Sequence, residues 1–310
     1  MEPLPPASFA PGTLAAAVSA ATSRALAAGA LRPIPTGRTF VEEGGVRFLV
    51  RVLANLARKD EERWRREREA TAGRPVNPFL PYERDLFVAE VSPTHVALLN
   101  KYNVVERHLL VVTREFEDQR TLLTPRDVGA LWRCLTEYPA LGFYNGGAEA
   151  GASQPHKHLQ IVALPLAPEG PPVPIEPLIE QALWRGEGGV ATLPGFDFRH
   201  AFVLLRGAAG GTGADARAVW EAYRALLGAV GVRAPSGGDH PVEQSAPYCL
   251  LVTREWMLLV PRSREHFGTV SINSLGYAGA LLVRNEDELR SLREAGPLAV
   301  LRGTAIPSGC

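Results

Sequence analysis

The sequence predicts an α+β protein. Short apolar segments with β-branched residues, typical of strands, are mixed with stretches that carry helical signals. The two kinds of segment follow no regular β-α-β order, which favours an α+β fold over a doubly wound parallel sheet. The chain has 310 residues, of which 46% are hydrophobic and 21% charged. This composition is typical of a soluble globular protein with one large domain or two ordinary ones.

The N-terminal part begins with helical signals and continues with strands. We expect a helix over residues 12–31, closed by Gly29, and a strand over residues 45–52. Residues 53–68 are dense in charge, and we interpret them as an exposed helix with a solvated face rather than a binding surface. Further strands are expected over residues 86–90, 96–99, 108–113 and 143–145.

A helix start is expected at Thr124. Thr124 can serve as the N-cap, Pro125 occupies the first helical position, and Asp127 stands at the third, which together resemble a capping box. The helix is expected to run to about Tyr138.

Six prolines between residues 165 and 177 indicate a linker, which we place at 166–177. This divides the chain into a catalytic region, 1–165, and a C-terminal region, 178–310. Around and beyond the linker we expect helices over residues 176–184, 214–230 and 286–294, the last of them terminal, and strands over 196–198, 201–205, 248–253 and 256–261.

Charge and cysteine content exclude several classes of protein. The formal net charge is zero, so no global field favours nucleic acid or an anionic membrane as a partner. The three cysteines are widely spaced and odd in number, which argues against a disulfide framework and for a reducing compartment. We find neither a signal peptide nor a spanning segment, and therefore expect a cytoplasmic protein.

One segment concentrates polar side chains on a predicted strand. It reads Gly-Ala-Ser-Gln-Pro-His-Lys-His-Leu-Gln from Gly151 to Gln160 and continues into apolar, β-branched residues. Because side chains alternate along a strand, His156, His158 and Gln160 share one face. Burying three polar groups side by side costs free energy unless they face a site.

Two kinds of chemistry fit this face. A neutral imidazole can attack phosphorus and form a phosphoramidate, and the N–H groups of the small-residue turn before it can bind an anion. Two histidines at this spacing can instead bind a metal ion. However, the ligands that would complete such a site, among His108, Cys134 and His200, are distant in the sequence. We therefore favour the nucleophile and expect no metal bound by the protein itself.

The same segment, with Asn145 before it, resembles the diadenosine tetraphosphate (Ap4A) phosphorylases, or ATP adenylyltransferases. This family belongs to the histidine-triad (HIT) superfamily, in the transferase branch with galactose-1-phosphate uridylyltransferase. Residues 77–79 with 92–101, and 256–263 with 273–279, extend the resemblance to most of the chain. It implies a HIT-like antiparallel sheet with flanking helices, extended by a C-terminal α+β part.

The resemblance also implies roles for individual residues. His158 would be the nucleophile that accepts AMP, His156 would support its orientation, and Gln160 would hydrogen-bond the transferred phosphoryl group. Gln160 replaces the third histidine of the HIT hydrolases, which favours transfer to an acceptor over hydrolysis. The further substrate contacts that it implies are Lys59, Asn100, Lys101, Asn145, Gly151, Ala152, Ser153, Gln154, Asn273, Ser274 and Leu275.

The reaction implied is reversible phosphorolysis, in which Ap4A and phosphate give ATP and ADP. A divalent cation, Mg²⁺, would be bound through the substrate phosphates, with no organic cofactor. We expect a monomer, with a homodimer as the alternative. A dinucleoside polyphosphate hydrolase, a sugar-1-phosphate nucleotidyltransferase and a nucleotide sensor without turnover remain alternatives.

Two features stand apart from the family pattern. Val105-Glu106-Arg107-His108 replaces the Val-Pro-Gly-His of many superfamily members, which leaves the geometry of that turn open. Three arginines, Arg262, Arg264 and Arg284, could clamp phosphates, and Arg262 is the best placed of them because it follows a strand end at Pro261.

Overall fold

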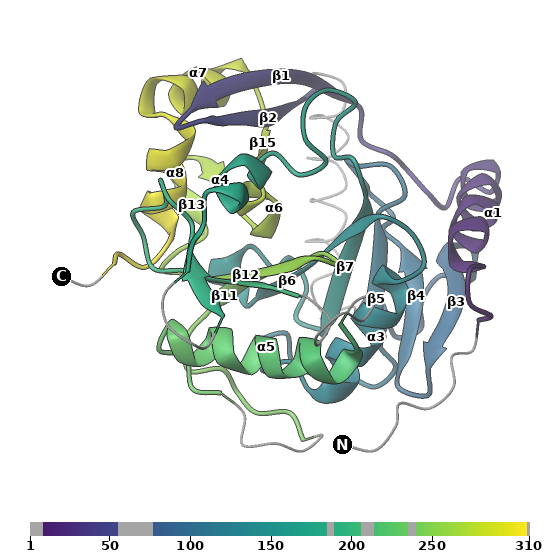
Figure 1. Ribbon diagram of the computed structural model, residues 1–310. Helices are drawn as coiled ribbons and strands as arrows, with labels where there is room; N and C mark the ends of the chain where they lie inside the picture. The colour runs from purple at the N-terminus through teal and green to yellow at the C-terminus, as the bar shows by residue number, and fades with distance from the viewer. Residues whose placement is uncertain (1–8, 55–76, 185–188, 206–213, 235–239, 309–310) are drawn as a thin grey trace.

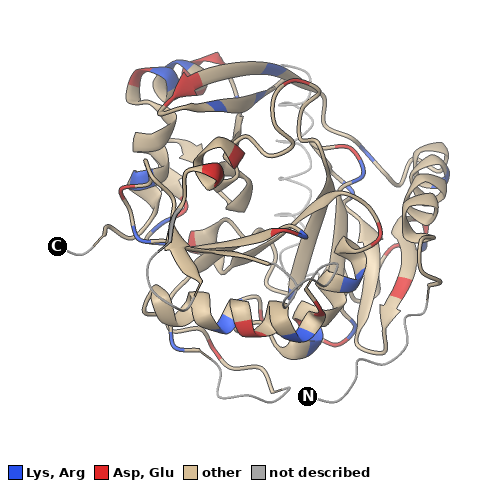
Figure 2. Cartoon of the chain, viewed as in Figure 1, with Lys and Arg blue, Asp and Glu red and all other residues tan. Residues whose placement is uncertain are grey.

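The structure is a computed structural model that describes residues 9–54, 77–184, 189–205, 214–234 and 240–308 (Figure 1). Charged residues of both signs are interspersed along its helices and strands (Figure 2), in agreement with the zero net charge. Within these ranges, no helix combines the length and the apolar character needed to cross a bilayer.

A ten-stranded sheet forms the centre of the molecule, and all its strand pairs are antiparallel. In spatial order, its strands are β3 (Phe87–Ser92), β4 (His95–Leu99), β5 (Leu109–Thr113), β7 (His158–Ala163), β6 (Ala140–Gly146), β11 (Tyr248–Val252), β12 (Trp256–Pro261), β10 (Ala201–Leu204), β9 (Val190–Thr192) and β8 (Leu183–Trp184). The pairing of β6 with β11 joins the N-terminal and C-terminal parts of the chain into one sheet.

A smaller sheet lies above the large one in Figure 1. Strands β1 (Thr36–Glu43) and β2 (Val46–Leu53) form a hairpin, and β15 (Ala280–Val283) adds to β2 in parallel. A short hairpin, β13 (His266–Phe267) with β14 (Val270–Ser271), precedes β15. A strand from near the end of the chain therefore completes a sheet whose other two strands come from the N-terminal part.

Helices cover both faces of the large sheet. Helices α1 (Leu14–Ala27), α3 (Pro125–Leu135) and α5 (Ala216–Ala229) pack on one face, and their apolar side chains form a shared core with it. The other face carries the small sheet together with α4 (Glu176–Glu180), α6 (Ser274–Tyr277), α7 (Glu286–Ala295) and α8 (Pro297–Thr304). A mixed structure with a large antiparallel sheet and flanking helices confirms the α+β prediction.

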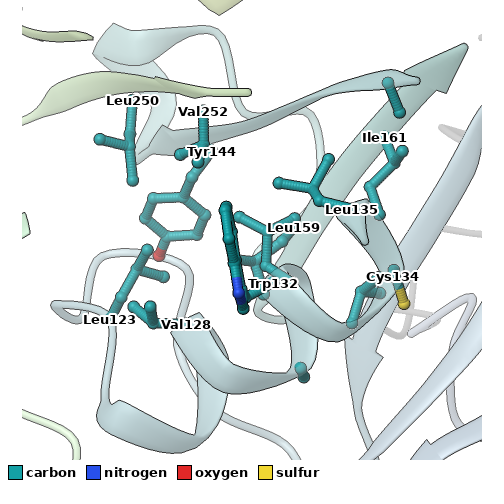
Figure 3. Close-up of a cluster of buried hydrophobic side chains, with 14 of the residues drawn as sticks. Leu123, Val128, Trp132, Cys134, Leu135, Tyr144, Leu159, Ile161, Leu250 and Val252 are labelled. Atoms are coloured by element: carbon teal, nitrogen blue, oxygen red, sulfur yellow. The ribbon is translucent and has the colours of Figure 1, made fainter. Parts of the chain in front are cut away.

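Packing against α3 fixes the register of β7. Leu159 and Ile161 are fully buried beside Trp132 and Leu135 of α3 (Figure 3), and each contributes roughly 2 kcal/mol of hydrophobic free energy. A slip of one residue would turn both side chains to the other face. His158 and Gln160 are thereby held on the face opposite α3.

The predicted start of α3 is confirmed. The Thr124 hydroxyl accepts a hydrogen bond from the Asp127 backbone N–H at 3.3 Å, and the Asp127 carboxylate accepts from the Thr124 N–H at 2.7 Å. This reciprocal capping box satisfies two donors that have no partner within the helix. The helix ends at Leu135, three residues before the expected end at Tyr138.

Several boundaries differ from the sequence prediction because pairing partners are distant in the chain. The helix expected over 176–184 stops at Glu180, since residues 183–184 pair with β9 as an edge strand. Residues 196–198 form no strand; Phe196 and Phe198 stack on each other instead. Helix α7 is followed by α8 after Gly296, so it is not terminal. The helix expected over 53–68 lies almost wholly outside the described residues.

The expected linker is built into the core. Leu166, Val173 and Ile175 are buried in the cluster that joins the small sheet to the large one. The division of the chain at residues 166–177 stays a prediction, and the large sheet is continuous across it.

Candidate active site

The polar face of β7 lies between two apolar clusters. His158 pairs with Val112 of β5, and Gln160 pairs with Leu110 of β5 and Phe143 of β6. On one side, Leu110 and Val112 pack with Phe79; on the other, Phe143 belongs to the cluster of the C-terminal part. The row of polar groups is therefore flanked by walls from distant parts of the chain.

His158 has the geometry of a neutral nucleophile. Its Nδ1 lies 2.8 Å from the main-chain oxygen of His156, and because a carbonyl only accepts, Nδ1 carries the proton and the lone pair is on Nε2. Burial lowers the pKa of His158 to about 4, although the hydrogen bond to the carbonyl opposes this shift. At neutral pH the ring is therefore uncharged and its Nε2 is able to attack.

His156 precedes the regular strand, and hydrogen bonds fix its ring from both sides. Its Nε2 donates to the main-chain oxygen of Thr113 at 2.8 Å, and its Nδ1 accepts from Asn77 Nδ2 at 2.8 Å. His156 thus orients His158 through its carbonyl rather than through its side chain. With both ring nitrogens engaged, the ring offers no lone pair to a metal ion.

A chain of three side chains orients Gln160. Its Oε1 accepts from His108 Nε2 at 2.9 Å, and His108 Nδ1 accepts from Asn100 Nδ2 at 3.1 Å. Burial lowers the pKa of His108 to about 4, so the ring stays neutral. This arrangement leaves the Gln160 amide nitrogen as the donor available to an anion. Asn100 reaches the site through His108.

The turn before His108 keeps the conformation that glycine normally supplies. Arg107 has a φ of 54°, in the left-handed region that non-glycine residues rarely adopt. His108 still enters the site after this turn. The departure from Val-Pro-Gly-His therefore changes the residue and preserves the turn.

Two predicted residues from the C-terminal region meet the N-terminal site. Asn145 Oδ1 accepts from the Ser274 N–H at 3.0 Å and from the Ser274 hydroxyl at 2.6 Å. Gly151 has a φ of +87°, and a Cβ built there would lie 2.8 Å from the Cβ of Asn273. Only glycine permits this close approach, so residues more than a hundred positions apart form one wall.

The turn before the histidines offers fewer free donors than expected. The Gly151 N–H donates to the Ala148 oxygen at 2.8 Å, and the Ala152 N–H donates to the Gly147 oxygen at 3.1 Å. The prediction that both N–H groups are free for an anion is therefore wrong, because the turn η2 (Ala148–Ala150) uses them. Ser153 is exposed and Gln154 is half-buried beyond this turn.

Gln119 was missed from the sequence. Its Oε1 accepts from the His158 N–H at 2.8 Å, and its Nε2 donates to the Asn145 oxygen at 2.8 Å. Gln119 thus holds the backbone of His158 against that of Asn145. Nothing in its local sequence marks it. His108 was considered only as a distant metal ligand, although the turn at Val105 pointed to it.

A cavity of about 200 Å³ adjoins the Gly151 turn through Asn273. Its walls come from β2, β15, α6 and the segment before His108, and include Leu275.

Two arginines, Arg51 and Arg284, line this cavity. Arg51 donates to the Leu166 oxygen at 3.0 Å, and burial, with Arg38 nearby, lowers its pKa. Arg284 donates to the Glu288 carboxylate at 2.8 Å. Arg51 was not predicted, and Arg284 was considered less favourable than Arg262.

Arg262 is a structural residue, and its interpretation as a phosphate clamp is wrong. Its guanidinium is buried and donates to the main-chain oxygens of Thr304 at 3.0 Å and of Arg264 and Ile272 at 2.8 Å each. Because backbone carbonyls use its N–H donors, Arg262 ties α8 to the segment before Asn273.

The predicted lysines do not join this group. Lys101 Nζ forms an ion pair with Glu83 at 2.5 Å, where both side chains are partly exposed. Lys59 lies outside the described residues. The role of Lys101 as a substrate contact stays a prediction.

Behind the site, Lys157 enters a buried network of charges. Its Nζ lies 2.7 Å from Glu117 Oε2 and 3.1 Å from Asp127 Oδ2, while Asp127 Oδ1 lies 3.0 Å from His95 Nε2. Burial alone would raise the pKa of Asp127, but Lys157 and His95 together hold it well below its ordinary value. Asp127 is therefore a carboxylate that both caps α3 and anchors the β7 segment.

Comparisons with known proteins agree with this site. The model of the Ap4A phosphorylase N-terminal domain matches residues 5–181, and that of the ATP adenylyltransferase C-terminal domain matches residues 194–307. The chain belongs to the Ap4A phosphorylase family. The resemblance seen in the His-x-His-x-Gln segment is thereby confirmed.

Two proteins of Saccharomyces cerevisiae are similar along most of their length. Diadenosine 5',5'''-P1,P4-tetraphosphate phosphorylase 2 is 30% identical over 247 residues, which cover 70% of this chain and 72% of that protein. Protein APA1 is 26% identical over 305 residues, which cover 92% of this chain and 91% of that protein.

The crystal structure of yeast Ap4A phosphorylase Apa2 has the same fold. It matches with a TM-score of 0.75 at 23% identity, and the match covers 96% of this chain and 95% of that one. The predicted antiparallel sheet with flanking helices and a C-terminal α+β extension is confirmed by this likeness.

Proposed function

We propose that this protein is an Ap4A phosphorylase that converts Ap4A and phosphate into ATP and ADP through an adenylylated His158. The observation that carries the proposal is the fixed tautomer of His158, a buried neutral imidazole with its lone pair on Nε2. The yeast relative named as a diadenosine tetraphosphate phosphorylase supports this substrate. An Apa2 structure described as a complex with Ap4A supports binding of the dinucleotide by this fold.

The first half-reaction forms the covalent intermediate. The lone pair on His158 Nε2 attacks the α-phosphorus of one AMP unit, the N–P bond forms, and the bond from that phosphorus to the bridging oxygen breaks. ATP leaves with the bridging oxygen and its electron pair. Nδ1 keeps its proton throughout, and the His156 carbonyl stabilises the positive charge that the ring acquires.

The second half-reaction restores the enzyme. An oxygen of inorganic phosphate attacks the same phosphorus, the N–P bond breaks, and its electrons return to Nε2 as ADP forms. The Gln160 amide nitrogen is placed to donate to an oxygen of the transferred group in both steps, since His108 fixes its Oε1. A neutral amide donates to the phosphoryl group but cannot accept the proton that an attacking water would have to lose.

We assign the nucleoside of the transferred AMP to the cavity beside Asn273. Leu275 and other apolar side chains of its lining suit a base, while Arg51 brings positive charge to its edge and Arg284 is paired there with Glu288. The contacts of Asn145 with Ser274 and of Gly151 with Asn273 place this cavity next to the glycine turn.

A cation carried by the substrate suits the residues present. Among the described residues, no three histidines, cysteines or acids converge in a way that could hold a metal ion. We therefore propose that Mg²⁺ binds through the oxygens of the polyphosphate, where it would neutralise charge. We further expect a monomeric, cytoplasmic enzyme.

The test follows AMP and product identity. Wild-type protein incubated with Ap4A labelled in its adenosine should retain label as a protein adduct, and His158→Ala should not. With phosphate present, ATP and ADP should form in equal amounts. Equal turnover without phosphate would support a hydrolase, and tight binding with no adduct would support a sensor. Transfer of the label to hexose 1-phosphates in preference to phosphate would support a sugar nucleotidyltransferase.

A further inference from the structure

Phe116 is the most exposed of the large apolar side chains in the described residues, and it lies beside the proposed site. It is 55% exposed, and its ring centroid is 5.5 Å from that of His156, in an edge arrangement. Single exposed apolar residues are common, so exposure alone identifies no site. Phe116 differs from other exposed apolar residues in two ways: its ring lies beside His156, and hydrogen bonds fix the backbone next to it.

The backbone around Phe116 is fixed to the catalytic segment. The oxygen of Glu117 accepts from the Lys157 N–H at 2.7 Å, and the Gln119 N–H donates to the Pro155 oxygen at 2.8 Å. The Glu117 carboxylate also forms the ion pair with Lys157. The ring is therefore presented to solvent from a backbone that is anchored on both sides of His156, at Pro155 and Lys157.

Aromatic rings connect the nucleophile with this exposed position. The ring centroid of Phe79 lies 5.5 Å from those of both His158 and His156. The ring centroid of Phe116, which is nearer the surface, lies 5.5 Å from that of His156. Leu80, which follows Phe79, is also exposed. An apolar rim thus extends from the catalytic ring to the surface.

This rim belongs to a different wall from the nucleoside cavity. Phe79 packs with Leu110 and Val112 of β5, whereas the cavity is lined from the C-terminal part by residues such as Leu275. The cavity volume of about 200 Å³ is below the roughly 300–1,000 Å³ of clefts that bury a drug-sized ligand. One nucleoside fills it, so the second nucleoside of a dinucleotide must bind elsewhere.

The charge next to Phe116 favours a base over a phosphate. Glu115, which precedes Phe116 in the chain, is exposed, whereas the Glu117 carboxylate is paired with Lys157. A carboxylate repels phosphate oxygens but accepts hydrogen bonds from the exocyclic amino group of a nucleobase. An exposed aromatic ring next to such an acceptor therefore suits a stacked purine.

We propose that Phe116 is the stacking platform for the base of the second nucleoside, the one that leaves as ATP. This proposal rests on the proposed function, because it needs a substrate with two nucleosides. Since stacking a base on an aromatic side chain is sequence-tolerant, Phe116 would raise affinity for dinucleotides of any purine.

The test compares two reactions that share His158 and differ in the second nucleoside. Phosphorolysis of Ap4A needs both nucleosides, whereas exchange of labelled phosphate into ADP passes through the same adenylylated enzyme with one. Phe116→Ala should raise KM for Ap4A about 10- to 100-fold with little change in kcat. It should leave the exchange rate unchanged, and Phe116→Trp should restore KM. Leu26→Ala, at a similarly exposed position of α1, is the control.

Four outcomes decide between these roles of Phe116. Loss confined to Ap4A phosphorolysis supports the platform. Equal losses in both reactions, or no change in either, would overturn it in favour of a structural or an incidental role. Absence of both reactions in the wild-type protein would overturn the proposed function and the platform with it.

Discussion

Consecutive residues of the β7 segment face opposite electrostatic environments. His158 is neutral, and its nearest polar partners are a carbonyl and an amide. Lys157, one position earlier, points to the other side and lies between two carboxylates. The environment of His158 is neutral, whereas the positive charge of Lys157 is balanced by carboxylates within the protein.

The difference shows how the fold separates anchoring from chemistry. A carboxylate beside His158 would raise its pKa and protonate the lone pair that the reaction needs. The Asp127 carboxylate instead stands behind the strand, where it pairs with Lys157 and His95. Strand alternation lets a single segment use strong ion pairs for position without placing them in the site.

The largest effect is expected from breaking the buried charge network of Lys157, Glu117, Asp127 and His95 behind β7. Lys157→Met leaves the buried Asp127 carboxylate without its cation and should lower the free energy of unfolding by about 3–5 kcal/mol. Urea denaturation measures this change. Adding Asp127→Asn should cost less than the sum of the two single substitutions, because the pair acts as a unit. A single variant as stable as wild type would refute the network's role.

A smaller effect is expected from removing His108, which holds Gln160 on the neutral side of β7. His108→Ala frees the Gln160 amide to rotate and should lower kcat about 10- to 100-fold, somewhat less than loss of a direct donor to the transition state. Steady-state phosphorolysis measures it. His200→Ala is the matched control: this histidine is equally buried, but its ring binds the Phe198 and Leu193 backbone. Equal losses of kcat in both variants would contradict a specific role for His108.

The smallest effect is expected from moderate acid. Because the pKa of His158 is about 4, formation of the adenylyl-enzyme should be nearly constant from neutral pH to about pH 5 and fall below about pH 4. Single-turnover reaction with Ap4A is the measurement, since inorganic phosphate itself titrates near neutrality. A decline centred near pH 6.5 would show an ordinary, solvated histidine.

The histidines beside the site and the Asp127 carboxylate behind it should also differ in how their contributions to stability depend on pH. The unfolded chain takes up protons on His108 and His158 near pH 6.5, and the folded chain only near pH 4, so protons favour the unfolded state in this window. The contribution of His108 and His158 to the free energy of unfolding should therefore fall as the pH falls from about 6.5 to 4. Asp127 has a lowered pKa, so its contribution should be lost only below the ordinary carboxylate pKa of about 3.8.

Local patterns made part of this structure predictable. Alternation placed His158 and Gln160 on one face of β7, and the Thr124 capping box marked the start of α3. Both signals lie within a few residues of the feature they describe. The family resemblance added the residues of the C-terminal region, of which Asn273 and Ser274 do meet the N-terminal site.

Features that depend on distant pairing could not be read in this way. Gln119 reaches His158 across 39 positions, and Arg51 enters the cavity because β15 pairs with β2. Arg262 follows a strand end, like many binding arginines, and only the folded chain shows that it is buried, with its donors used by the main-chain oxygens of Arg264, Ile272 and the distant Thr304. The donors of Gly151 and Ala152 were lost to a turn that composition alone does not define.

The pairing of β6 with β11 also has a consequence during synthesis on the ribosome. All seven residues of β6 are buried in the finished fold, and one of its two edges is covered only by residues that are translated about a hundred positions later. Until then the nascent chain carries an open, apolar strand edge, which is a template for wrong pairing. The cavity that we propose for the nucleoside is completed later still, when β15 joins β2, so a growing chain contains His156 and His158 well before this cavity exists.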